Sequence, residues 1–154
     1  MALHDVAPLE ASVEIAAPPA EVWHRLSNLA NMQRWSPQNQ RTVVLGKPAV
    51  GTKFANLNRR GLLVWPTFGE IVHFDRERKL AFRILDNGTV WSFDLEPTPR
   101  GTGVVQRREA PDGIKTLSVG LTTVFMGGTK DFCAELQAGM EQTLAALKAD
   151  IETL

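Results

Sequence analysis

A long stretch near the C-terminus decides the expected fold: residues 129–152 read TKDFCAELQAGMEQTLAALKADIE. Apolar side chains recur there every three or four residues, which is the period of one helix face. That face comprises Phe132, Leu136, Met140, Thr143, Leu144, Leu147 and Ile151, while Lys130, Glu135, Gln142, Lys148 and Glu152 fall largely elsewhere. Thr129 is a suitable N-cap for the first turn. The segment therefore predicts a helix of about 35 Å with one apolar face to cover.

The preceding part of the chain has the two-residue period of β-strands. Residues 9–15, LEASVEI, alternate strictly between apolar and polar side chains. Asn87-Gly88 is the strongest hairpin signal, because both residues tolerate a positive φ. Strands that follow one another without intervening helices form an antiparallel sheet. The further strands are expected at 41–46, 52–60, 63–74, 79–86, 89–96 and 102–109.

Two short helices are expected between the first strand and the rest of the sheet. Pro19 suits the first turn of a helix, and apolar residues follow it at helical spacing, which predicts a helix over 19–27. One or two further turns are expected at 29–34. Residues 1–8 are expected to be a tail, and residues 9–154 a single domain. The long helix is the only element large enough to cover the sheet, so an α+β fold with a cavity between sheet and helix is predicted.

Composition excludes several classes of protein. The 154 residues fit one domain, and 17 Lys+Arg balance 17 Asp+Glu, so the chain lacks the basic excess of a nucleic-acid-binding protein. It has neither a signal-peptide pattern at the N-terminus nor an apolar run long enough to span a membrane, so a cytoplasmic protein is expected. The single cysteine, Cys133, excludes an intramolecular disulfide and is expected to be an inert buried thiol.

No metal or cofactor is expected. The three histidines, His4, His24 and His73, are not at a metal-ligand spacing, and the chain has no phosphate-binding loop, dinucleotide fingerprint or nucleophile elbow. His73 shares strand parity with Trp65 and Ile71, so it could point inward and act as a general acid or base. A solvent-facing strand histidine is the simpler alternative.

Inward-facing aromatic and polar side chains are the candidates for binding a ligand. Asn58 and Arg60 share parity with Phe54, and Gln106 and Arg108 share parity with Val104. Buried polar groups need partners, so these side chains would either address a ligand or join an internal network, for instance with Glu70 or Glu109. The candidate ligand-binding residues are Trp35, Asn58, Arg60, Trp65, Phe82, Trp91, Phe93, Gln106 and Met140, and the weak catalytic candidates are His73, Arg60 and Arg108.

Several stretches, taken in order, resemble one known family. They are VEIAAPPAEVW at 13–23, WSP at 35–37, VGTKF at 50–54, NRRG at 58–61, GEIV at 69–72, LAFR at 80–83 and GTGVV at 101–105. In order and spacing they resemble the polyketide cyclase/dehydrase and lipid-transport family of the START-like (SRPBCC, birch-pollen-allergen-like) superfamily. The resemblance implies the helix-grip fold, a curved antiparallel sheet of six to seven strands around the C-terminal helix. It also implies that Trp35 lies near the cavity mouth.

Three functions follow from the sequence and the resemblance. The first is binding or carriage of a hydrophobic or aromatic small molecule between sheet and helix. The second is a cyclase, aromatase or dehydratase that holds a reactive poly-carbonyl chain in a folded pose. The third is a protein-interaction module, and a homodimer is also left open. Fold alone does not choose between them.

Overall fold

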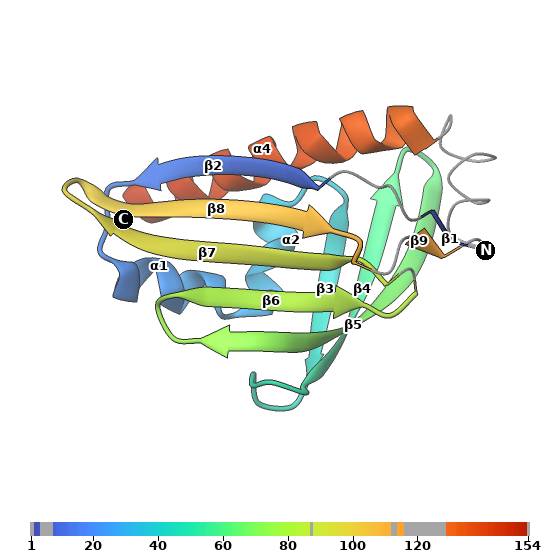
Figure 1. Ribbon diagram of the computed structural model, residues 1–154, viewed down its shortest axis with the longest axis horizontal. Helices are drawn as coiled ribbons and strands as arrows, with labels where there is room; N and C mark the ends of the chain where they lie inside the picture. Colours follow the sequence, from blue (N-terminus) through green and yellow to red (C-terminus); the bar gives the residue numbers. More distant parts are fainter. Residues whose placement is uncertain (1, 4–7, 87, 112–113, 116–128, 154) are drawn as a thin grey trace.

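The chain forms a seven-stranded antiparallel sheet with a long C-terminal helix (Figure 1). The computed structural model describes residues 2–3, 8–86, 88–111, 114–115 and 129–153. The strand order is β2-β8-β7-β6-β5-β4-β3, in which every neighbouring pair is antiparallel. The strands are β2 (Leu9–Ile15), β3 (Asn39–Leu45), β4 (Lys53–Arg60), β5 (Leu63–Asp75), β6 (Lys79–Ile84), β7 (Val90–Thr98) and β8 (Gly101–Glu109). The α+β fold and the antiparallel sheet expected from the sequence are confirmed.

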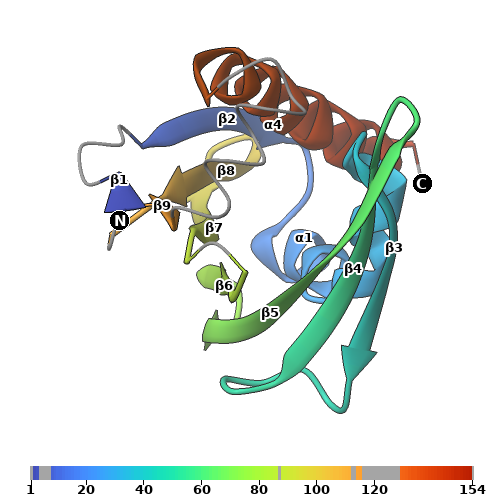
Figure 2. The same ribbon diagram turned by 90° about the vertical axis from the view of Figure 1, so that its right-hand side faces the viewer.

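The sheet curves around the helices on its inner side. Helix α4 (Thr129–Glu152) runs beside β2 along one edge, and Figure 2 shows the sheet bending round so that β5, β4 and β3 stand opposite. Helix α1 (Pro19–Leu26), a 3-10 turn (Leu29–Asn31) and α2 (Met32–Trp35) connect β2 to β3. The predicted long helix and the two short helices are therefore confirmed, and the sheet grips α4.

The hairpin between β6 and β7 shows why the turn residues matter. Gly88 has a φ of +77°, and its backbone N–H donates to the carbonyl of Ile84 at 2.8 Å. The strands then pair with Phe82 opposite Trp91. Asn87, the other half of the expected hairpin signal, lies outside the described residues.

Strand β5 carries an irregularity that reverses which side chains point inward. Its register with β6 shifts between Ile71 and His73, as at a β-bulge. Ile71 is fully buried, and Phe74, three residues later, also packs against the core. An extra residue in a strand moves every following side chain to the other face, so His73 is exposed. The prediction from strand parity that His73 could point inward is therefore wrong, and His73 faces solvent, as the simpler alternative held.

A group of buried side chains lies where the end of α4 and helix α1 meet the sheet. The side chains that are almost completely buried there are Ile15, Val22, Leu26, Phe93, Leu144, Leu147 and Ile151. Trp23 of α1 packs edge-on against Phe74, with ring centroids 5.1 Å apart. The predicted helix-on-sheet role of Trp23 is confirmed.

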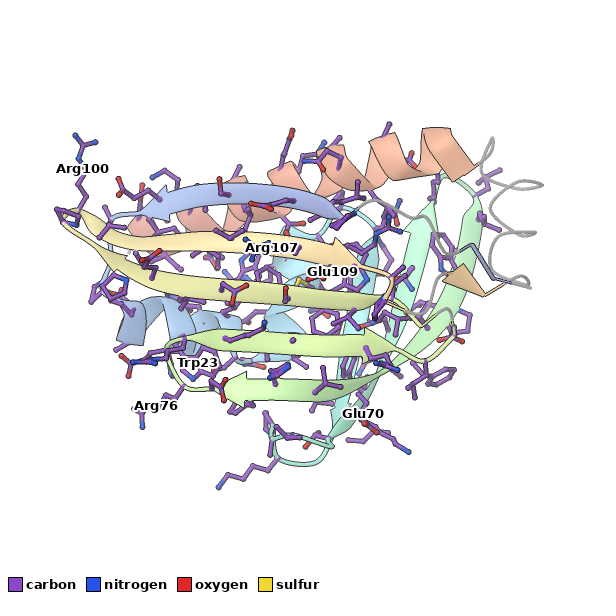
Figure 3. The ribbon with its side chains drawn as sticks, viewed as in Figure 1. Trp23, Glu70, Arg76, Arg100, Arg107 and Glu109 are labelled. Atoms are coloured by element: carbon purple, nitrogen blue, oxygen red, sulfur yellow. The ribbon has the colours of Figure 1, made fainter. Side chains whose placement is uncertain are left out.

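The outer face of the sheet is polar near β8. Arg107 lies on this face (Figure 3) and pairs with Glu10 at 3.2 Å and with Asp94 at 3.0 Å. Gln106 and Arg108 point to the opposite, buried side, so the predicted alternation along β8 is confirmed. Among the described helices, none combines the length and hydropathy that crossing a membrane requires.

The N-terminal residues contribute to a second, small sheet. Strand β1 (Ala2–Leu3) pairs antiparallel with β9 (Ile114–Lys115), so the expected tail of residues 1–8 contains a short strand. Residues 116–128 and the side chain of Cys133 lie outside the described part of the structure, and with them the expected buried thiol.

Candidate functional site

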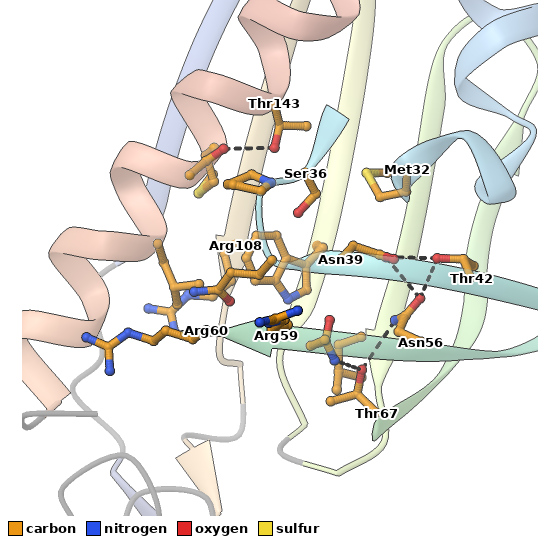
Figure 4. Close-up of a pocket in the computed structure, with 18 of the residues that line it drawn as sticks. Met32, Ser36, Asn39, Thr42, Asn56, Arg59, Arg60, Thr67, Arg108 and Thr143 are labelled. Carbon is orange, nitrogen blue, oxygen red and sulfur yellow. Dashed lines mark hydrogen bonds between the residues drawn. The ribbon is translucent and has the colours of Figure 1, made fainter. Parts of the chain in front are cut away.

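A cavity of about 470 Å³ lies between the curved sheet and the N-terminal half of α4. This volume is within the range of pockets that hold a small organic molecule. Strands β3 to β8 and the segment around α2 supply the remaining walls, and Figure 4 shows part of this lining. The sheet and the helix therefore diverge here, whereas they pack closely at the other end of α4.

One wall of the cavity is apolar. Phe54 and Phe82 meet edge to face, with centroids 5.3 Å apart and planes at 89°. Trp91 adds an indole whose Nε1 donates to the hydroxyl of Thr89 at 3.2 Å. The other apolar side chains of the lining are Leu29, Met32, Pro37, Trp65, Ile84, Leu136, Ala138 and Met140. These rings offer stacking surfaces to a flat ligand.

Gly69 makes room for this aromatic wall. It pairs with Phe54 across β4 and β5, and a Cβ on Gly69 would stand 2.3 Å from Cζ of Phe54. Real Cβ atoms essentially never come so close to another carbon, so the Phe54 ring can occupy this position only because residue 69 is glycine. The shape of the cavity thus depends on a missing side chain.

A second part of the lining, on β3, β4 and β5, is a chain of neutral hydrogen bonds, which we call the amide ladder: Asn39, Thr42, Asn56, Thr67 and Asn58 (Figure 4). Asn39 Nδ2 donates to Thr42 Oγ1 at 2.8 Å, and Thr42 Oγ1 donates to Asn56 Oδ1 at 2.8 Å. Asn56 Nδ2 and Asn58 Nδ2 both donate to Thr67 Oγ1, at 3.3 and 3.0 Å. The ladder holds side chains of β3, β4 and β5 in fixed positions against the cavity.

Sequence spacing alone did not reveal the first two members of the ladder. Asn39 and Thr42 are three residues apart, an odd spacing that puts side chains on opposite faces of a regular strand. The register of β3 with β4 shifts between Asn39 and Arg41, and this irregularity brings both side chains to the cavity. Asn56 was visible from its parity with Phe54, as Asn58 was.

Arginines gather at one end of the cavity. Arg60 Nε lies 2.5 Å from Glu135 Oε2 of α4, so an ion pair joins the end of β4 to the helix. Arg108 is only 3% exposed and lines the same cavity, as does Arg59. The expected internal network, with Glu70 or Glu109, takes a different form for Arg60, because its carboxylate partner comes from the helix. The sequence pattern placed Glu135 outside the apolar face of the helix, so its ion pair with Arg60 was not predicted.

Eight of the candidate side chains lie on the cavity lining, namely Asn58, Arg60, Trp65, Phe82, Trp91, Gln106, Arg108 and Met140. The other three candidates lie outside the lining. His73 is exposed on the outer side of β5. Phe93 is completely buried in the core. It lies two residues further along β7 than Trp91 and does not reach the cavity. Trp35 is the third.

Trp35 is held by the C-terminal part of α4 instead of the cavity mouth. It is 4% exposed, and its Nε1 donates to Asp150 Oδ2 at 3.0 Å. Asp150 also accepts from Arg34 at 3.0 Å and from Arg25 at 3.4 Å. This contact fixes α2 against α4, so Trp35 has a packing role and Ser36 and Pro37, which follow it, reach the lining.

The lining suits binding and orientation more directly than acid–base chemistry. Its described ionisable side chains are Arg59, Arg60, Arg108 and Glu135, and none of its described residues is a histidine or a cysteine. Within the described residues there is also no group of three His, Cys, Asp or Glu side chains that could hold a metal ion. An apolar body would contact the aromatic wall, while its polar atoms would meet the amide ladder and the guanidinium groups.

Solved structures share this fold at low sequence identity. The protein TTHA0849 from Thermus thermophilus superposes with a TM-score of 0.74 at 17% identity, over 96% of this chain and 98% of that chain. The di-domain ARO/CYC StfQ from the steffimycin biosynthetic pathway gives a TM-score of 0.75 at 18% identity, and this chain spans 50% of its length. The AHSA1-like protein from Aeromonas hydrophila gives 0.66 at 19% identity, over 96% of this chain and 93% of that chain. Such likeness shows the helix-grip fold alone.

Sequence comparison identifies the family. No curated protein is significantly similar to the chain in sequence. The family model described as polyketide cyclase / dehydrase and lipid transport matches residues 7–152, which is nearly the whole chain. The motifs of both ends, from the first strand to the last turns of α4, lie inside that match. The chain therefore belongs to the polyketide cyclase/dehydrase and lipid-transport family, whose helix-grip fold it shows.

Proposed function

We propose that the protein binds a hydrophobic or aromatic small molecule in the cavity between its sheet and α4. One observation carries this proposal: a cavity of about 470 Å³ on the inner side of the sheet is lined both by aromatic rings and by a hydrogen-bonded amide ladder. A pocket of this size, with mainly apolar walls and a few polar groups, is the usual form of a small-molecule site.

The apolar and the polar side chains of the lining would contribute to binding in different ways. Phe82 and Trp91 supply apolar area, which gives most of the affinity for a ligand of this kind. Asn58 offers its amide oxygen as an acceptor and Arg60 offers guanidinium N–H donors, and both are held in position, the first by Thr67 and the carbonyl of Trp65 and the second by Glu135. Fixed polar groups add orientation and selectivity to the affinity that apolar contact provides.

A fluorescent apolar probe tests the proposal. N-phenyl-1-naphthylamine should bind saturably with one site and gain fluorescence, and Trp91→Ala should weaken its binding about tenfold by removing one wall. Arg60→Ala should matter less for this neutral probe than for a carbonyl-bearing aromatic ligand. Phe68→Ala is the matched control, because Phe68 is half exposed on the outer side of β5. No saturable binding to the intact protein would refute the proposal.

A cyclase or dehydratase is the second candidate, supported by the family and by the similarity to an aromatase/cyclase di-domain. Arg60, Arg108 and Glu135 are then the residues that could polarise a carbonyl or move a proton, since they line the cavity. His73 lies outside it, so His73→Ala should leave any turnover unchanged. Conversion of a poly-carbonyl chain that is lost in Glu135→Gln while probe binding persists would favour this candidate.

A further inference from the structure

Two buried amide oxygens of residues that line the cavity accept no hydrogen bond from the described residues. Gln106 is 4% exposed and Asn39 is 7% exposed, and both line the cavity. Among the residues that the structure describes, neither Gln106 Oε1 nor Asn39 Oδ1 accepts a hydrogen bond. Buried polar atoms in native proteins are nearly always paired, so two orphaned acceptors in one cavity call for an explanation.

The two acceptors stand on different walls. Gln106 belongs to β8 and Asn39 to β3, and the strands β7, β6, β5 and β4 lie between them in the sheet. Figure 2 shows the sheet curving so that β3 stands across from β8. Gln106 and Asn39 both line the cavity, although their strands are far apart in the order. A group that satisfies one acceptor therefore lies some way from the group that satisfies the other.

The contacts of the two amides within the protein leave their oxygens available to accept a hydrogen bond from a ligand. The Asn39 amide nitrogen already donates to Thr42 and Asn56, which fixes the orientation of the group and turns its oxygen away from the ladder. Gln106 stands opposite Phe93 in the sheet, and a phenyl ring offers no donor. Both amides are thus positioned by their strands with the acceptor oxygen unused.

From these positions we infer that the ligand carries hydrogen-bond donors at two separated places on an apolar or aromatic body, as a diol or bis-phenol does. One hydroxyl donates to Gln106 Oε1 and the other to Asn39 Oδ1, while the aromatic wall holds the body between them. This inference rests on the proposed function and narrows it. Methyl ethers and hydrocarbons of the same size offer no donors, so the cavity selects against them.

Three stilbenes of one size test the inference. 4,4′-Dihydroxystilbene, 4-hydroxystilbene and 4,4′-difluorostilbene differ in having two, one and no donors, and each can be titrated by displacement of N-phenyl-1-naphthylamine. The expected order of affinity is dihydroxy, monohydroxy, difluoro, with about tenfold weakening for each hydroxyl removed. Equal affinities for the dihydroxy and difluoro compounds would overturn the inference.

Two substitutions at one position test which atom of Gln106 is used. Gln106→Met removes the acceptor at similar size and should reduce the dihydroxy-over-difluoro preference about tenfold, with the affinity for the naphthylamine kept. Gln106→Glu keeps acceptor oxygens and should keep the preference. Preference lost in both variants would show that Gln106 donates through its amide nitrogen, and preference kept in Gln106→Met would show that it makes no hydrogen bond to the ligand. Either result would overturn the assignment. His73→Ala, on the outer face, is the control that should change neither affinity.

The readouts separate this inference from the proposed function. If the intact protein binds the naphthylamine but shows no preference among the stilbenes, the cavity binds apolar molecules and the donor rule alone is refuted. If it binds neither the naphthylamine nor any stilbene, the proposed function fails and the inference fails with it. Circular dichroism and thermal unfolding of each variant identify a loss of binding that comes from misfolding.

Discussion

The two ends of α4 meet the same sheet in different ways. At the closed end, which we define by β2, α1 and the helix residues Leu144, Leu147 and Ile151, most inward side chains are aliphatic and buried. At the open end, which we define by β3, β4, β5 and the helix up to Thr143, inward positions are occupied by the amide ladder, and the cavity remains.

The difference lies in where the inward side chains find their partners. Aliphatic side chains of the closed end gain only by packing against the helix, and they draw sheet and helix together. Side chains of the amide ladder are satisfied by one another along the sheet, so they gain nothing by reaching the helix. One sheet thus forms a close-packed core at one end and lines a cavity at the other.

The largest expected effect is a loss of unfolding free energy at two positions of α4, one in the closed end and one beside the cavity. Leu144→Ala should cost about 2–5 kcal/mol, because Leu144 is 1% exposed in the closed end. Met140→Ala should cost roughly half as much, because Met140 borders the existing cavity and its removal enlarges a space already present. Urea denaturation measures both. A loss below about 0.5 kcal/mol for both would show that this helix face does not pack on the sheet.

Gly69→Ala should push Phe54 into the cavity and so reduce the cavity volume at the open end. The new Cβ would meet Phe54 ring atoms at 2.3 to 2.8 Å, so the ring must move, at a cost of about 1–3 kcal/mol. Binding of N-phenyl-1-naphthylamine should fall with it. Gly103→Ala is the matched control, because its Cβ would meet nothing closer than 3.5 Å. Unchanged stability and binding in Gly69→Ala would contradict the close approach.

Asp150→Asn should weaken the joint between α2 and α4. Asp150 accepts from Trp35, Arg34 and Arg25, and the amide keeps only part of this capacity and none of the charge. The expected loss is about 1 kcal/mol in denaturant unfolding, since the site is only partly exposed. Glu77→Gln is the control, because its partner Arg76 is largely exposed and such pairs contribute little. Equal losses of stability in the two variants would show that Asp150 does not stabilise the contact between α2 and α4.

The smallest effect concerns the pH dependence of the closed end. The ammonium of Lys148 donates to Glu152 Oε2 at 2.7 Å, and the backbone N–H of Ala16 donates to the same oxygen at 2.8 Å. These two hydrogen bonds, the first more than the second, hold the pKa of Glu152 below its usual range. A pKa lower in the folded than in the unfolded chain stabilises the fold at neutral pH, and this contribution is lost as the pH falls through the acidic range.

Carboxyl-carbon NMR titration measures this pKa directly. In Lys148→Met the pKa of Glu152 should rise toward that of an unpaired glutamate. A pKa that is the same in both proteins would show that the contact is not maintained in solution.

Much of the fold was predictable because its signals are local. Alternation in β2, the turn at Gly88 and the helical stripe of α4 are each properties of a few neighbouring residues. Two inward polar positions, Asn58 and Arg60, followed from parity with Phe54 for the same reason. Inference from period works wherever a strand or helix stays regular.

The errors occur where regularity breaks or where long-range contacts decide. The bulge after Ile71 reversed the parity that pointed His73 inward, and the shift after Asn39 hid one end of the amide ladder. Trp35 is held by Asp150, a residue 115 positions away, and no local pattern announces such a contact. The partner of Arg60 was missed because Glu135 lies beside the apolar stripe of α4 and not within it.

Methyl NMR of the methionines tests the central claim most directly, because Met32 and Met140 both line the cavity from different elements. Titration with N-phenyl-1-naphthylamine should shift both methyl signals with one shared dissociation constant. The methyl groups of Leu147 and Ile151, in the closed end, should stay nearly unchanged. Saturable binding that shifts Leu147 and Ile151 but leaves Met32 and Met140 in place would contradict a ligand site at the open end of the molecule.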